Sequence, residues 1–153
     1  MTDTVSAVAR HEFATLTPKA VYDAWLDAGT MRHWMEHHLR RSHPDERVTR
    51  IELNPVVGGR FDLADTREGS EAWGYYRALE RPGRIVFTWF VTPEEEAEDN
   101  SLVTIEISQA EAGCSASISH EMGVEWADYV EPTAKAWKSM LEAMDAALAG
   151  RMA

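Results

Sequence analysis

The strongest constraint on the fold is one long amphipathic segment near the end of the chain, from Trp126 to Leu148. Its apolar residues recur at spacings of three and four, at Val130, Ala134, Trp137, Leu141, Met144 and Leu148. That spacing places them on one stripe of a helix. The stripe needs an apolar partner, and the residues between Val48 and Met122 read as short strands joined by turns. The sequence therefore predicts a long helix packed on a curved sheet, an arrangement that often encloses a cavity.

Pro132 divides this segment. A proline inside a helix removes a hydrogen bond and clashes with the preceding turn. We therefore expect Pro132 in the first turn of a helix that begins near Glu131. Residues 126–130 then become a separate turn, which we interpret as a flap at the cavity entrance.

Alternating apolar residues and turn residues predict the strands of the sheet. A first strand is expected from Val5 to Leu16. Further strands are expected at residues 48–53, 60–64, 73–79, 85–91, 102–108 and 114–122. Because the connections have turn length, these strands predict an antiparallel meander.

Two short helices are expected between the first two strands. Thr17 and Pro18 have the character of a helix start, and Gly29 is placed to end that helix. Thr30 would cap a second short helix that carries Trp34. The polar stretch 37–47 predicts a loop.

Length and charge limit the classes of function. We expect a single domain spanning residues 1–153. The net charge of −11 argues against nucleic acid as a partner, because phosphate backbones attract basic surfaces. Part of this charge lies at residues 94–99, which we interpret as a solvated hairpin loop. No apolar run approaches the roughly 20 residues needed for membrane insertion.

The predicted compartment is the cytoplasm. Residues 1–10 lack the basic start and apolar core of a signal peptide. A single cysteine, Cys114, permits no intrachain disulfide and fits a reducing compartment. Its strand neighbours are apolar, which is typical of an inert thiol.

Aromatic residues supply the candidates for a binding site. The chain has six Trp, four Tyr and four Phe residues, which either fill the core or line a cavity. The residues we predict to bind a ligand are Trp34, Phe61, Trp73, Tyr75, Phe87, Trp89, His120, Met122, Trp137 and Leu141. Arg77 would reach an anionic ligand if it pointed inward, but we favour a solvent-facing side chain because strand parity is ambiguous there.

His120 is the polar candidate in this set. Its parity in the strand places it inward with Ile118 and Met122. It would either contact a ligand and move a proton, or be a structural histidine with satisfied hydrogen bonds, which we favour.

Other chemistry has little support. The cluster His33, Glu36, His37, His38 and His43 invites a metal site, but it lacks the His-Glu-x-x-His pattern, and we expect no metal. No nucleophile elbow, phosphate loop or dinucleotide fingerprint is present, so we expect no cofactor and lean towards a protein that is not an enzyme.

Several motifs, in order along nearly the whole chain, resemble one known family. They are Pro18, Val21, Tyr22 and Trp25, then the segments 27–34, 57–61 and 84–89, and finally His120, Trp137 and Leu141. Together they are similar to the homologues of the activator of the heat-shock-protein-90 ATPase, a branch of the START-like SRPBCC superfamily. Two departures are Met35-Glu36-His37-His38, where the family often has a proline, and Ala136, where it usually has glycine.

The resemblance implies an α+β helix-grip (START-like) fold. In this fold a curved antiparallel sheet of six to seven strands surrounds a long C-terminal helix, and two short helices follow the first strand. The implied function is binding of a small hydrophobic or amphipathic molecule between sheet and helix. The alternatives are a chaperone-associated interaction protein and a cyclase-like or hydrolase-like enzyme using the same cavity. A chaperone partner and a homodimer stay open.

Overall fold

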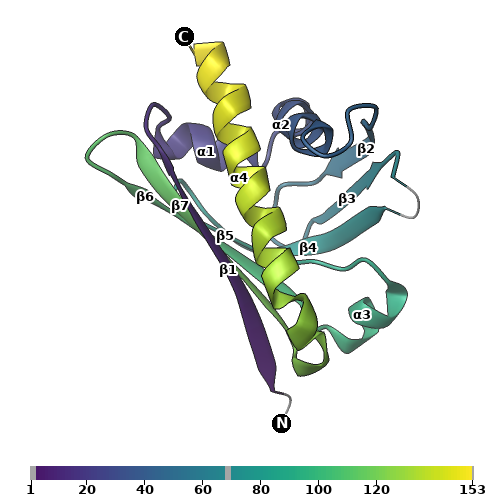
Figure 1. Ribbon diagram of the computed structural model, residues 1–153. Coiled ribbons are helices and arrows are strands. Elements are labelled where there is room, and N and C mark those ends of the chain that lie inside the picture. Colours follow the sequence, from purple (N-terminus) through teal and green to yellow (C-terminus); the bar gives the residue numbers. More distant parts are fainter. Residues whose placement is uncertain (1–2, 68–69, 153) are drawn as a thin grey trace.

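The computed structural model describes residues 3–67 and 70–152 of the chain. Its strands form one antiparallel sheet in the order β1-β7-β6-β5-β4-β3-β2 (Figure 1). The elements are β1 Thr4–Phe13, α1 Pro18–Ala24, α2 Ala28–Arg40, β2 Val48–Leu53, β3 Arg60–Asp65, β4 Glu71–Glu80, β5 Arg84–Thr88, α3 Pro93–Glu98, β6 Leu102–Gln109, β7 Cys114–Gly123, the 3-10 helix η1 Val124–Tyr129 and α4 Val130–Met152. The predicted helix-grip fold is confirmed.

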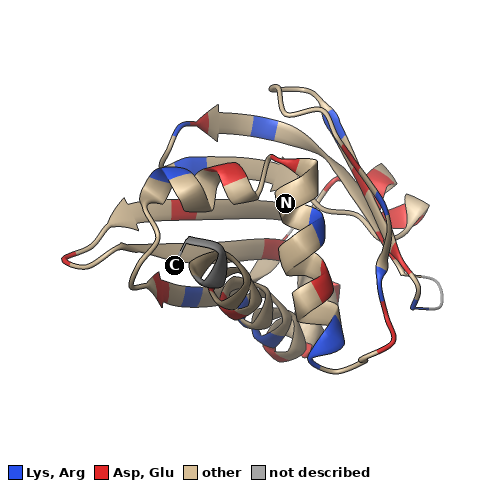
Figure 2. Ribbon diagram, turned by 90° about the horizontal axis from the view of Figure 1, so that it is seen from above, with Lys and Arg blue, Asp and Glu red and all other residues tan. Residues whose placement is uncertain are grey.

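The long helix α4 lies across the concave side of the sheet, and Figure 2 shows the strands bending around it. The stripe residues Trp137, Leu141, Met144 and Leu148 are buried. As predicted, Pro132 lies in the first turn of the helix, and a separate turn, η1, precedes it. No helix in the described part of the chain is both long and apolar enough to cross a membrane.

The two helices after β1 differ from the prediction in their boundaries. Thr17 caps α1 as expected, because its side chain accepts a hydrogen bond from the Ala20 amide at 3.1 Å. Gly29, however, lies inside α2 and does not end α1. The Asp27 carboxylate accepts a bond from the Thr30 amide at 2.9 Å, so Asp27 starts α2 in place of Thr30. The helix continues to Arg40, which corrects the loop predicted from residue 37.

The acidic stretch 94–99 is a short helix, α3, and the predicted hairpin loop is wrong in this respect. Thr92 and Glu95 form a capping box, in which each side chain bonds the backbone of the other residue. Pro93 occupies the first turn, where its missing amide costs nothing. This Thr-x-x-Glu spacing was a readable signal for the helix.

Gly74 allows β3 and β4 to bring an aromatic ring against the sheet. Phe61 pairs with Gly74 in the register of the two strands. A Cβ atom at residue 74 would lie 1.9 Å from the Thr88 carbonyl oxygen and 2.8 Å from Phe61 Cζ. The bare backbone at this position therefore lets the Phe61 ring lie on the concave face, where the candidate site is found.

Candidate functional site

A small cavity of about 20 Å³ lies between the sheet and α4. That volume holds about one water molecule. The walls are aromatic rings and long aliphatic side chains: Trp25, Met31, Met35, Leu53, Phe61, Leu63, Tyr76, Ile85, Phe87, Trp89, Trp137 and Met140. In this conformation the interior is packed, and the cavity by itself has no room for an organic ligand.

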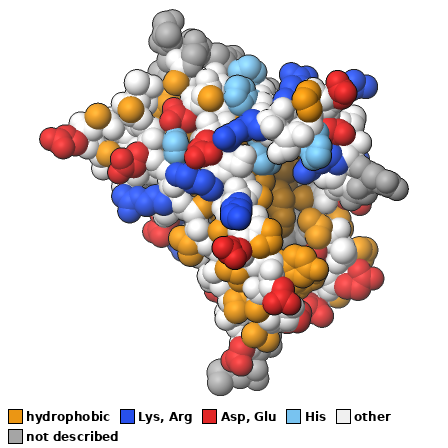
Figure 3. Space-filling view, viewed as in Figure 1, with side chains coloured by type: hydrophobic (Ala, Val, Ile, Leu, Met, Phe, Trp, Pro, Cys, Tyr) orange, Lys and Arg blue, Asp and Glu red, His pale blue; other side chains and the backbone are white. Residues whose placement is uncertain are grey.

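Two larger hollows of about 170 and 360 Å³ adjoin this cavity. We call them together the groove. Trp89 and Met140 line the small cavity and both hollows, so these two half-buried side chains stand where the three spaces meet. Figure 3 shows the groove as a depression with orange walls and with blue and pale blue side chains along one edge.

The walls around Trp89 are held by contacts between rings. The Trp89 ring centroid lies 5.2 Å from that of Trp137 and 5.9 Å from that of Phe61. Phe61 in turn meets Phe87 edge to face at 5.3 Å. These are the distances of favourable aromatic pairs, and they fix the position of the wall between the cavity and the groove.

The 3-10 helix η1 and the start of α4 form the outer part of the larger hollow. Trp126 and Tyr129 of η1 line it, with their ring centroids 5.2 Å apart. Tyr129 is 55% exposed, and Val91, which also lines this hollow, is 44% exposed. The segment that we interpreted as a flap thus lies beside the larger hollow.

His120 has a partner for each ring nitrogen. Trp137 Nε1 donates to His120 Nδ1 at 3.1 Å, so the neutral ring carries its proton on Nε2, which lies 2.8 Å from Ser101 Oγ. Burial lowers the pKa of His120 to about 4, because the charged form would lose its hydration. This is the arrangement expected of a structural histidine. A role in ligand binding stays a prediction.

The structure brings most of the predicted site residues together. Phe61, Phe87, Trp89 and Trp137 line the small cavity, and His120 and Met122 line the larger hollow. Trp34 and Leu141 are fully buried in the core instead, and Trp34 Nε1 donates to the Ala24 carbonyl at 2.9 Å.

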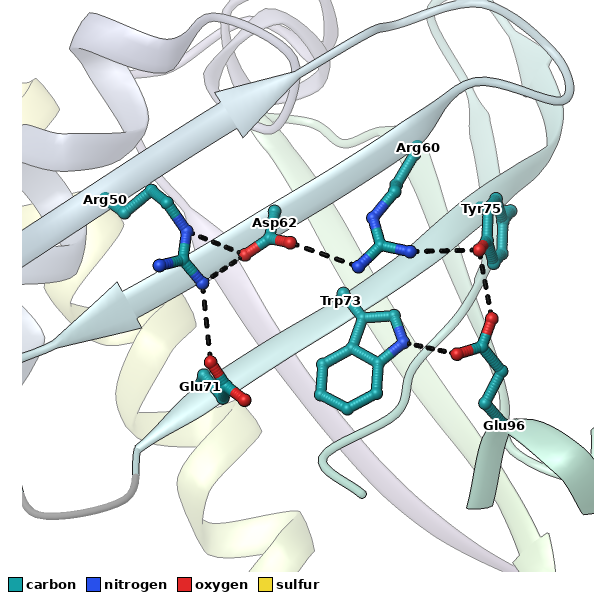
Figure 4. A network of polar contacts seen from close by, with 7 residues as sticks. All are labelled: Arg50, Arg60, Asp62, Glu71, Trp73, Tyr75 and Glu96. Atoms are coloured by element: carbon teal, nitrogen blue, oxygen red, sulfur yellow. Dashed lines mark hydrogen bonds and ion pairs between the residues drawn. The ribbon is translucent and has the colours of Figure 1, made fainter. Parts of the chain in front are cut away.

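Trp73 and Tyr75 lie on the opposite face of the sheet. Trp73 Nε1 and the Tyr75 hydroxyl donate to the two carboxylate oxygens of Glu96 on α3, each at 2.9 Å. Arg60 donates to the Tyr75 hydroxyl at 3.0 Å and lies over both rings. Figure 4 shows this network on the side of β3 and β4 that faces away from α4.

Strand alternation explains this placement. Because side chains alternate along β4, Tyr76 faces the cavity when Trp73 and Tyr75 face outward. Our prediction that Trp73 and Tyr75 point inward was wrong. Residues 72–76 are apolar or aromatic on both faces of the strand, so the sequence did not show which face is inward. Arg77 shares the outer face and pairs with Asp99 at 3.2 Å, in agreement with the solvent-facing alternative.

The sequence analysis missed eight residues of the small cavity's wall: Trp25, Met31, Met35, Leu53, Leu63, Tyr76, Ile85 and Met140. Met140 had a usable signal, because it follows Trp137 by three residues and therefore shares its helix face. Tyr76 would have followed from the correct parity of β4. Trp25 follows directly after α1 and Met35 lies within α2, where the predicted helices were too brief to define a face.

Charged groups border the groove near α2. His38 lines both hollows, and its Nδ1 lies 3.0 Å from Ser139 Oγ on α4. Burial, with the neighbouring Arg67 and Arg41, lowers the pKa of His38 to about 4. Arg67 is paired with Asp65 at 2.8 Å. At this edge of the groove, His38 is therefore neutral at pH 7 and the charge of Arg67 is balanced by Asp65.

The histidine cluster of α2 is divided between two sides of the helix. His33, Glu36 and His37 border a separate surface hollow with Arg40 and Arg41, while His38 faces α4. Within residues 3–67 and 70–152, no group of three or more His, Cys, Asp or Glu side chains is arranged to hold a metal ion.

Solved structures share this fold at low sequence identity. A protein from Nitrosomonas europaea is 10% identical, with a TM-score of 0.77 over 97% of this chain and 96% of that chain. An AHSA1-like protein from Aeromonas hydrophila is 17% identical, with a TM-score of 0.72 over 97% and 94%. The Aha1 dimer from Colwellia psychrerythraea is 13% identical, with a TM-score of 0.73 over 92% and 93%.

Sequence comparison gives the family. A comparison with curated proteins returned no match. A family model described as "Activator of Hsp90 ATPase homolog 1-like protein" matches residues 15–149, which is most of the chain. The chain therefore belongs to the Activator of Hsp90 ATPase homolog 1-like family.

Proposed function

We propose that this protein binds a small hydrophobic or amphipathic molecule in the groove, with one end of the molecule against Trp89 and Met140. The observation that carries the proposal is the continuity of the three spaces, because these two side chains line all of them. A shift of either side chain would widen the passage between the small cavity and the groove.

The size and the walls of the groove support this function. Small-molecule sites have volumes of about 300–1,000 Å³ and mostly apolar walls with few polar groups. The larger hollow, at about 360 Å³, falls in this range. Met35 and Met140 in the inner walls are unbranched and adaptable, so the boundary can repack around a ligand.

The properties of Cys114 and His120 favour binding over catalysis. Cys114 is fully buried, and burial raises the pKa of its thiol, which makes it a poor nucleophile. His120 has both ring nitrogens engaged and a pKa of about 4, so it is a weak base at neutral pH.

Native mass spectrometry after incubation with cell-extract lipids and aromatic compounds tests the proposal. We expect bound small molecules on the wild-type protein and a clear loss of them in Ala136→Trp, because Ala136 is half-buried in the wall of the larger hollow. The matched control is Ala134→Trp, on the side of α4 that faces β1. Apo protein in every sample, or equal binding by both variants, would contradict the proposal. The same spectra report whether the chain forms a homodimer.

The family description favours a second candidate, an effect on a chaperone ATPase. We would measure the turnover of the Hsp90 ATPase with and without this protein. An increase that Ala136→Trp leaves intact would support a chaperone-associated role that does not use the groove. Unchanged turnover would remove this candidate.

A further inference from the structure

The larger hollow of the groove is lined by two pairs of aromatic rings from three parts of the chain. Trp89, directly after β5, and Trp137, on α4, form one pair, with ring centroids 5.2 Å apart and an angle of 66° between the ring planes. Trp126 and Tyr129 of η1 form the other pair, with centroids 5.2 Å apart and an angle of 59°. Both the more buried and the more exposed part of the wall are therefore aromatic.

The pair on η1 is left open to solvent. Tyr129 is 55% exposed, Trp126 is half-buried, and η1 has no buried residue. Trp89, by contrast, also contacts the rings of Phe61 and Phe87. Exposed apolar groups that gather beside a hollow are typical of binding surfaces. A ligand in the larger hollow would therefore cover aromatic surface that the fold itself leaves in contact with water.

The titratable groups of the larger hollow favour an uncharged ligand. Among the described residues that line it, Arg67 and Glu95 carry charges at neutral pH, and their signs are opposite. Arg67 is paired with Asp65 at 2.8 Å, and Glu95 Oε1 accepts hydrogen bonds from two backbone amides at 3.0 and 3.1 Å. His38 and His120 are neutral at pH 7, chiefly because burial lowers both pKa values to about 4. An ionised ligand would therefore compete with contacts that the charged groups already make.

We infer that the larger hollow binds an uncharged molecule through an aromatic ring, which contacts both the Trp89–Trp137 pair and the Trp126–Tyr129 pair. Aromatic rings attract one another beyond the effect of buried area, because the ring face is electron-rich and the ring edge is electron-poor. A saturated ring of similar size lacks this attraction. A protein partner would cover Tyr129 without reaching Trp137, which is 2% exposed, whereas a hollow of about 360 Å³ suits a small molecule. This inference rests on the proposed function and specifies which molecules the groove selects.

A pair of probes with the same carbon skeleton tests the inference. The rings of 2-naphthol are aromatic and those of decahydro-2-naphthol are saturated, and both probes are uncharged at pH 7. Dissociation constants for both would be measured by NMR titration with wild-type protein, Trp126→Leu, Tyr129→Leu and Tyr75→Leu. Tyr75 is the matched control, because it is an aromatic residue on the outer face of the sheet and lines none of the three spaces.

We expect wild-type protein to bind 2-naphthol about two- to tenfold more tightly than the saturated probe. A site that recognised apolar area alone would bind the saturated probe at least as tightly. Trp126→Leu and Tyr129→Leu should each remove much of this preference, by weakening 2-naphthol binding while the saturated probe stays within about twofold. Tyr75→Leu should keep the wild-type ratio. Because η1 has no buried residue, both of its variants should fold as well as wild type.

The outcomes separate the inference from the proposed function. If both probes bind wild-type protein and neither η1 variant changes the ratio of their constants, the inference is overturned and the groove remains a binding site. Trp126 resonances that move with protein concentration before any probe is added would show that a second copy covers these rings, which also overturns the inference. If neither probe binds, the inference fails, whereas the proposed function is decided by the native mass spectra, in which the loss expected for Ala136→Trp does not depend on the class of the bound molecule.

Discussion

The two faces of β3 and β4 use similar residues in different ways. On the concave face, Phe61 and Tyr76 pack against other rings, with centroids 5.6 Å apart. On the outer face, Trp73 and Tyr75 are held by polar contacts to Glu96 and Arg60. The inner rings depend on packing and on exclusion of water, whereas the outer rings depend on hydrogen bonds at the protein surface. The kind of residue therefore does not reveal which face holds the site.

Truncation of Phe61 should have the largest effect on stability. Phe61 is 4% exposed and touches the rings of Tyr76, Phe87 and Trp89. Phe61→Ala removes this packing and leaves a void, so we expect a loss of about 3–5 kcal/mol in the free energy of unfolding, measured by urea denaturation.

The matched variant on the outer face is Tyr75→Ala. Tyr75 is half-buried and borders solvent, so its truncation leaves a space that water can fill. We expect less than half of the loss seen for Phe61→Ala. Equal losses for the two variants would mean that both faces are packed as one core, and the comparison between them would fail.

His120 makes the stability of the folded protein depend on pH. The unfolded chain binds a proton on this histidine near pH 6.5, whereas the folded protein does so only near pH 4. Acidification through this interval therefore favours the unfolded state, and the His120 contribution amounts to about 3 kcal/mol lost by pH 4. Below pH 4 the histidine is protonated in both the folded and the unfolded state, so His120 should cause no further loss of stability.

Denaturation of His120→Gln between pH 7 and pH 4 measures this contribution. Glutamine offers an acceptor to Trp137 and a donor to Ser101 but does not titrate in this range. We expect a shallower loss of stability than in wild type, with a remainder from His38, whose pKa is also lowered to about 4. His43→Gln, in the exposed loop after α2, is the control. A slope for His120→Gln that matches the wild-type slope would contradict this assignment.

The sequence predicted the fold well where one face of a strand is clearly apolar. In β6, Val103, Ile105 and Ile107 alternate with polar residues, and all three are buried as expected. The same holds for Cys114 to Met122 in β7. Local patterns also predicted the long helix, its division at Pro132 and the six strands of the meander.

The candidate site was less predictable because tertiary contacts decide it. Trp73 faces outward, where Arg60 and α3 cover it, and neither contact is visible in the pattern of β4. Met35 and Met140 become neighbours of Trp89 only when α2 and α4 are placed on the sheet.

Glu96 should have the smallest effect, and it tests the outer face alone. Its carboxylate accepts from Trp73 and Tyr75, and these two hydrogen bonds lower the pKa of Glu96. Glu96→Gln keeps one acceptor oxygen, so one of the two bonds is lost, and we expect a loss of about 1 kcal/mol or less at pH 7. The near-ultraviolet circular dichroism of Trp73 should change, whereas Glu94→Gln, at an exposed position of the same helix, should alter neither quantity. Since acid removes the charge of Glu96, the difference between Glu96→Gln and wild type should shrink as the pH falls below the ordinary range of a glutamate. A loss comparable to that of Phe61→Ala would show instead that the polar network stabilises the sheet as strongly as the packed face does.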